Sequence, residues 1–387
     1  MTTQDTTTTR RYLFDSANQA KPNPQCLEAL ALGSSEGWAD ARKIYHEGRH
    51  SSILKQATKE TVAQAITETH PKEVHFSPKY QQAVELLAMA LAQNYDHVIT
   101  TEIEKDIVRK AFAEPRFAKV TTLALSDTGG IVIEDLKDKL EKLAADATEQ
   151  KTILVIQIAN HEIGTIQPVV EISALCDQYQ VPLILDASSS FGRIEITETK
   201  YAGLIIDTAD LGNPCQSAIL ILKDQLKVSP NWNYDGDPWY SGMAPLGICF
   251  AAAIAVRDAV GESLARFRAL DPFISRLRKE LPQKIDDLQI VGSAENRLPH
   301  ILTFSCLYVE GETLVRALDE KGFIVASGSA CLSEENQPSH VLAALGKITQ
   351  GNIRISLPED CQENQILEFI QELPKVVRNI RELLGVL

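Results

Sequence analysis

Short apolar runs alternate with amphipathic helical patterns from about residue 70 to residue 222. Runs rich in Val, Ile and Leu predict strands, and apolar residues recurring every three or four positions predict helices. The predicted strands cover 74–76, 97–100, 119–126, 152–159, 181–185, 203–206 and 218–222, and the predicted helices cover 83–93, 104–114, 132–143 and 170–180. Strands that alternate with helices predict βαβ units, and therefore a mainly parallel sheet covered by helices on both faces.

The pattern changes after Pro245. An Ala-rich segment predicts one long helix, and a charged helical stretch follows it and ends near Leu288. The Ala-rich helix is predicted at 249–270. Further strands are predicted at 301–307 and 352–357, and further helices at 312–322, 341–345 and 365–384. The sequence thus predicts an α/β fold: a lead-in at 1–14, a large α/β domain at 15–248, and a smaller α+β C-terminal domain at 249–387.

Composition narrows the class of protein. With 387 residues, 44% of them hydrophobic, the chain can bury a large core. No apolar run reaches the roughly 18 residues that a membrane span needs, and the N-terminus lacks the apolar core of a secretory signal. The net charge of −14 argues against nucleic acid as a general partner. We therefore expect a cytoplasmic protein that binds neither membrane nor nucleic acid.

The seven cysteines give no sign of a metal site or a disulfide framework. None stands in a C-x-x-C pair or beside a suitably spaced histidine. No H-E-x-x-H arrangement occurs either. We expect reduced thiols and no bound metal.

One cysteine lies in a distinctive segment, ASGSACLSEENQPSHVLAALG, at 326–346. The small residues before Cys331 permit a tight, flexible backbone, so the thiol could move. The alternative is a buried structural thiol, because free cysteines are commonly buried. Spacing alone does not decide between the two.

This segment resembles the active-site cysteine loop of the cysteine desulfurases, whose pattern is SSGSAC followed by PS-x-VL-x-ALG. These are pyridoxal-phosphate (PLP) enzymes of the class V aminotransferase fold, fold type I, and they take sulfur from L-cysteine as a cysteine persulfide. The resemblance implies that Cys331 carries sulfur, that PLP is the cofactor, and that the protein dimerises.

Other positions follow the family pattern. Asp186 resembles the partner of the pyridine nitrogen, although it could instead cap the turn after its strand. Asn160 is a candidate contact to cofactor or substrate, with a turn-holding role as the alternative. Ser189 stands where the family has a glutamine that meets the ring hydroxyl. Arg354 resembles the arginine that holds the substrate carboxylate, and Asn18 stands in the segment that lines the substrate pocket.

The lysine that would bind PLP covalently is missing. Such an enzyme needs a lysine aldimine, because exchange with the substrate amine starts from it. No lysine occurs between Lys200 and Lys223, and the family position falls on Ala209 or Asp210.

The phosphate site also departs from the family. The turn T-S-G-A/G-T-E reads Phe76–Gln81 here, so that Pro78 has no N–H to donate and Tyr80 replaces a small hydroxyl residue. Lys105 stands where the family stacks a histidine on the ring, and the segment 240–245 lacks the arginine that reaches the phosphate from the dimer partner.

Three hypotheses follow. The first is a desulfurase-like protein that has lost covalent PLP chemistry and serves as a sulfur-carrying or scaffolding partner of a sulfur or iron–sulfur acceptor through Cys331. The second is an active cysteine desulfurase, or a related lyase or transaminase, that binds PLP non-covalently. The third is a structural subunit, as a homodimer or paired with an intact paralogue.

Overall fold

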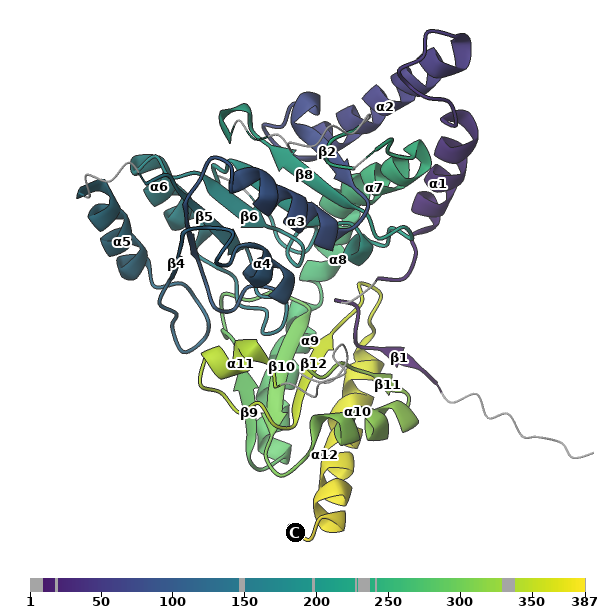
Figure 1. The fold of residues 1–387 in the computed structure, drawn as a ribbon. Coiled ribbons are helices and arrows are strands. Elements are labelled where there is room, and N and C mark those ends of the chain that lie inside the picture. Colours follow the sequence, from purple (N-terminus) through teal and green to yellow (C-terminus); the bar gives the residue numbers. More distant parts are fainter. Residues whose placement is uncertain are drawn as a thin grey trace, which may run out of the picture.

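The two apolar patterns of the sequence fold into two lobes, each with its own hydrophobic core (Figure 1). The computed structural model describes residues 10–17, 20–145, 150–196, 199–226, 228, 237–240, 242–328 and 338–386. The helices are α1 (Pro24–Glu36), α2 (His46–Ala65), α3 (Tyr80–Leu91), α4 (Asp106–Ala111), α5 (Ile133–Ala145), α6 (Val169–Gln178), α7 (Leu246–Asp258), α8 (Leu264–Arg268), α9 (Asp271–Lys284), α10 (Gly311–Glu320), α11 (His340–Ala344) and α12 (Glu363–Leu383). The strands are β1 (Tyr12–Leu13), β2 (Val74–Ser77), β3 (His97–Thr100), β4 (Lys119–Thr122), β5 (Thr152–Gln157), β6 (Leu183–Asp186), β7 (Gly203–Asp207), β8 (Ala218–Leu222), β9 (Leu288–Val291), β10 (Ile301–Cys306), β11 (Phe323–Ile324) and β12 (Asn352–Ser356).

The larger lobe is built on a seven-stranded sheet in the order β2-β8-β7-β6-β5-β3-β4. Neighbouring strands from β7 to β4 run parallel. The pairs β2–β8 and β7–β8 run antiparallel at the other edge. The predicted α/β fold with a mainly parallel sheet is therefore confirmed.

Helices cover both faces of this sheet, which explains why its strands are continuously apolar. In β5, Ile153 and Val155 enter the core that α3 and α4 complete. Leu154 and Ile156 enter the core on the opposite face, together with residues of α5, α6 and α7. All four side chains are fully buried, and each contributes about 1.5–3 kcal/mol of burial free energy.

The smaller lobe combines the antiparallel sheet β12-β10-β9 with α9, α10 and α12 around a second core. The N-terminal segment joins this core although it comes first in the chain. β1 pairs in parallel with β11, and the fully buried Phe14 ring lies 5.8 Å from Phe323 and 5.5 Å from Phe369. This placement fixes the residues that follow Phe14 at the junction of the lobes.

The single helix predicted for 249–270 is wrong. The segment is α7, a π-helical turn (Ala259–Ser263) and α8, and Gly261 within the turn has non-helical φ −93° and ψ −124°. Glycine is a poor helix former, so the break falls there. α7 packs on the larger core through Ala252 and Val256, so the boundary predicted at residue 248 cuts off a helix that belongs with that core. We propose a boundary after α7.

No helix in the ranges described above is both long and apolar enough to cross a membrane. Within the same ranges, His, Cys, Asp and Glu side chains form no group of three or more that could hold a metal ion.

Candidate functional site

The candidate site lies where the carboxyl ends of β5, β6 and β7 meet the smaller lobe. In open α/β sheets this edge is where ligands bind. The Thr303 hydroxyl on β10 donates to the Glu162 carbonyl at 2.6 Å, and Arg354 on β12 donates to the His161 carbonyl at 3.3 Å. The turn after β5 is therefore held against the second sheet.

Asp186, the last residue of β6, is 2% exposed, and both of its carboxylate oxygens are engaged. Oδ1 accepts the Ser188 N–H at 2.9 Å, which is the turn-capping role that the sequence left open. Oδ2 accepts the Tyr80 hydroxyl at 2.6 Å. A pyridine nitrogen that came to this carboxylate would meet the Tyr80 phenol.

Tyr80 is the first residue of α3 and is 3% exposed. Burial, together with the nearby Asp186 carboxylate, raises the pKa of its phenol well above the usual value. The phenol therefore stays protonated and donates to Asp186. The Lys105 ammonium lies 4.8 Å from the centre of the Tyr80 ring, as a cation–π contact. The buried Tyr80 thus occupies the place beside Asp186, and Lys105 lies over the Tyr80 ring.

Asn160 is completely buried, and its side chain forms hydrogen bonds at the turn after β5. Its Oδ1 accepts the N–H groups of Glu162 at 2.9 Å and Ile163 at 2.8 Å, and its Nδ2 donates to the Ile103 carbonyl at 2.9 Å. These bonds favour the turn-holding role. A contact to cofactor or substrate stays a prediction, as it does for Ser189, which is half-buried and has no side-chain hydrogen bond among the described residues.

Arg354 is 8% exposed, and its guanidinium is already bound within the chain. Nη2 forms an ion pair with the Asp15 carboxylate at 2.8 Å, and buried Nε has no hydrogen bond within the described residues. A substrate carboxylate would have to displace Asp15 to take the usual two-pronged position.

The two positions to which the family lysine maps lie on the 3-10 helix η2 (Ala209–Leu211), directly after β7. Ala209 and Asp210 are both buried. Burial raises the pKa of Asp210 to about 7, while Lys105 acts to lower it. Neither residue carries an amine.

Two predicted site residues, Cys331 and Asn18, lie outside the described residues. The described chain ends before the cysteine at Gly328 and resumes at Pro338. Both flanks meet Glu162: its carboxylate accepts the Ser339 hydroxyl at 2.8 Å, and a Cβ on Gly328 would lie 2.1 Å from Oε1.

Sequence reasoning missed Glu162 and Glu104, and it did not place the Tyr80 side chain. Burial raises the pKa of both Glu162 and Glu104, that of Glu104 to about 8. The available signals were an acid, Glu162, in the turn N-H-E-I-G that follows an apolar strand, and a bulky aromatic residue at the start of α3. Neither signal reveals which residue each of these side chains contacts.

The residues present do not fit PLP. The ring-nitrogen partner is engaged by Tyr80, and neither Ala209 nor Asp210, the two positions to which the family lysine maps, carries an amine. Pro78 offers no N–H to a phosphate. The buried Ser77 hydroxyl, in the same turn, has no hydrogen-bond partner within the described chain.

Comparison with known proteins shows the family. The sequence profile described as Aminotransferase class-V matches residues 11–203 and 263–369, and the chain belongs to this family. It is 30% identical to "Cysteine desulfurase IscS 1" of Archaeoglobus fulgidus, over 96% of this chain and 98% of the relative. It is 28% identical to "Cysteine desulfurase IscS" of Dictyoglomus turgidum, over 96% of both chains.

Solved structures agree with the fold. A "NIFS-LIKE PROTEIN" superposes with a TM-score of 0.83 at 22% identity, over 95% of this chain and 99% of the other. A NifS-like protein from Rickettsia africae gives a TM-score of 0.82 at 18% identity, over 95% of this chain and 100% of the other.

Proposed function

We propose that this protein is a cysteine-desulfurase-like sulfur carrier or scaffold that works without covalent PLP chemistry, with Cys331 as the sulfur-bearing thiol. One observation supports the loss of cofactor chemistry above all others: the Tyr80 phenol is hydrogen-bonded to Asp186, where a ring nitrogen would have to be. The absence of a lysine at positions 209 and 210 supports it as well, because neither an alanine nor an aspartate can form an aldimine.

Sulfur transfer through Cys331 needs no cofactor. The Cys331 thiolate attacks the outer sulfur of a donor persulfide, R–S–SH; the donor S–S bond breaks, and the donor leaves as a thiolate. An acceptor thiolate then attacks the outer sulfur of the Cys331 persulfide, and Cys331 leaves as a thiolate. One sulfur atom moves in each step, its proton stays on it, and no outside oxidant or reductant is consumed.

The other cysteines are poorly suited to this role. Cys26, Cys176, Cys249, Cys306 and Cys361 are buried, and burial raises the pKa of each to about 12. Since the thiolate is the nucleophile, these thiols are inert at neutral pH. Cys215 is partly exposed, its pKa is also raised by burial, and it provides the matched control.

The second candidate is an active PLP-dependent cysteine desulfurase that converts L-cysteine to L-alanine and leaves the enzyme as a persulfide. The names of the relatives favour it, and on the comparisons alone it is the better supported of the two. Both proposals include a dimer, formed by two copies of this chain or with an intact paralogue. Both also include an acceptor protein and a cytoplasmic location.

One experiment separates the candidates. The purified protein is mixed with PLP and L-cysteine, and PLP absorbance and L-alanine are measured. In parallel, a small-molecule persulfide is added and mass spectrometry follows sulfur on each cysteine. We expect no bound PLP, no L-alanine, and one added sulfur on Cys331 that is lost in Cys331→Ser and kept in Cys215→Ser. Formation of L-alanine would establish the second candidate, and labelling that survives Cys331→Ser would overturn the sulfur-carrier proposal.

A further inference from the structure

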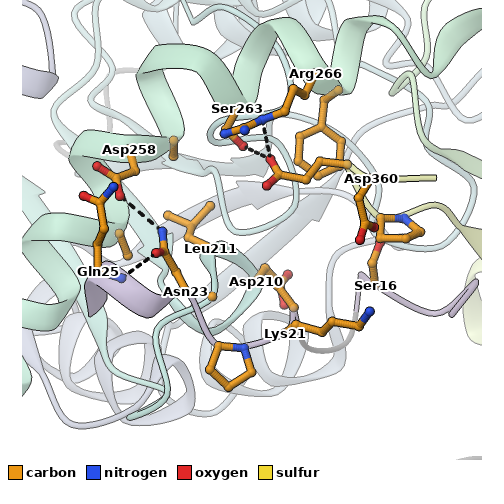
Figure 2. Close-up of a pocket in the computed structure, with 18 of the residues that line it drawn as sticks. Ser16, Lys21, Asn23, Gln25, Asp210, Leu211, Asp258, Ser263, Arg266 and Asp360 are labelled. Carbon is orange, nitrogen blue, oxygen red and sulfur yellow. Dashed lines mark hydrogen bonds and ion pairs between the residues drawn. The ribbon is translucent and has the colours of Figure 1, made fainter. Parts of the chain in front are cut away.

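A cavity of about 630 Å³ lies between the lobes, beside η2 (Figure 2). Its walls come from the segment before α1, from η2, from the end of α7 through α8, and from the residues after β12. Binding pockets for small molecules have volumes of this order. Figure 2 shows Asp210 between the wall with Asn23 and the wall with Ser16 and Asp360.

Two pairs of oppositely charged side chains at the cavity are already engaged with each other. Asp258 accepts a hydrogen bond from Asn23 at 3.1 Å and pairs with Arg257 at 2.8 Å. Glu359 accepts the Ser263 hydroxyl at 2.8 Å and pairs with Arg266 at 3.4 Å. These groups hold the walls together and leave little capacity for a ligand.

Arg193 is different, because it is a buried cation without an ion pair among the described residues. It is 5% exposed, and its guanidinium carbon lies 3.8 Å from the centre of the Phe267 ring. One N–H donates to the Asp210 carbonyl oxygen. Burial lowers the pKa of Arg193 to about 10, which still leaves it charged at neutral pH. Further N–H donors of the five on a guanidinium are therefore unused.

Asp210 lies beside Arg193 and is 7% exposed. Its side-chain carboxyl makes no hydrogen bond or ion pair within the described residues, although the carbonyl of the same residue is bonded and the charges of Lys105 and Arg193 act on the carboxyl from farther away. A buried polar group without a partner is costly, and a bound ligand that supplies the partner recovers this cost. Arg193 and Asp210 thus present an unused donor set and an unused acceptor on one cavity wall.

We propose that this cavity binds a small organic acid that carries a hydroxyl or amino group next to its carboxylate. The carboxylate meets the guanidinium of Arg193 in the geometry that a planar fork favours. The neighbouring hydroxyl or amino group donates to the carboxyl of Asp210. Arg354, which is paired with Asp15, does not line this cavity.

Calorimetry on the full-length protein tests the proposal with L-lactate and L-alanine as probes, and with acetate and methylamine as probes that keep only one group. We expect saturable binding of at least one two-group probe, at least tenfold tighter than that of acetate or methylamine. Arg193→Met and Asp210→Asn should each weaken it at least tenfold, and Arg257→Met, a paired arginine at the same cavity, should leave it unchanged. The unfolding midpoint of each variant is measured alongside.

Hydrogen–deuterium exchange on the unaltered protein gives a readout that does not depend on how the variants fold. The bound probe should protect residues 190–195, 209–212 and 263–268. Absence of saturable binding, binding that survives Arg193→Met, or protection elsewhere would overturn the proposal. Binding lost in Arg354→Met and kept in Arg193→Met would place the ligand at Arg354 and overturn it too. None of these outcomes depends on whether Cys331 carries sulfur.

Discussion

Replacing Tyr80 by phenylalanine removes a single oxygen atom from the contact with Asp186 and leaves the ring in place. The hydrogen bond is 2.6 Å long and buried, and the acceptor is a carboxylate. Hydrogen bonds to charged groups contribute about 1.5–3 kcal/mol, and an acceptor left without its donor in a buried site loses this contribution. No cavity of consequence forms, because the ring stays in its packing.

We therefore expect Tyr80→Phe to lower the free energy of unfolding by about 2 kcal/mol, which corresponds to roughly 2–3 °C in the melting midpoint of a chain of this length. Thermal unfolding followed by circular dichroism measures this. Tyr95→Phe is the matched control, since Tyr95 is half-buried and its hydroxyl has no hydrogen bond among the described residues. Equal midpoint shifts in the two variants would refute the claim that Tyr80 is tied to Asp186.

Three further predictions concern the surroundings of the site. Burial raises the pKa of Glu104 to about 8, against about 4.3 in an unfolded chain, so between these pH values only the folded state keeps the proton. The free energy of unfolding should therefore fall as pH rises, by roughly 1.4 kcal/mol per pH unit at most. Glu104→Gln should flatten this slope in denaturant titrations from about pH 5 to 8. Asp15→Asn should lower the free energy of unfolding by about 3–5 kcal/mol, because it leaves buried Arg354 without its counter-charge. A denaturation midpoint equal to that of the unaltered protein would contradict the ion pair. Phe14→Ala should lower the free energy of unfolding by about 3–5 kcal/mol in the same assay, because the ring is fully buried between two other phenylalanines. A decrease of less than about 1 kcal/mol would show that the N-terminal segment does not complete the second core.

The sequence by itself determined the fold class. The apolar runs of the large sheet have no polar alternation, because both faces are buried, and this pattern can be recognised without a structure. It also determined which chemical groups are absent, since no lysine occurs between Lys200 and Lys223. It missed β9, a short strand of half-buried residues that follows a charged helix without an apolar run, and it missed the break at Gly261.

Only the tertiary structure decided what the remaining polar residues contact. The sequence could say that Tyr80 replaces a small residue, but not that its hydroxyl reaches Asp186, 106 positions further along the chain. It could propose Arg354 for a substrate, but not that Asp15, 339 positions earlier, already binds it. The physical reason is that local patterns record the burial and periodicity of each element. The partner of a buried polar group is chosen by packing between elements that are distant in sequence.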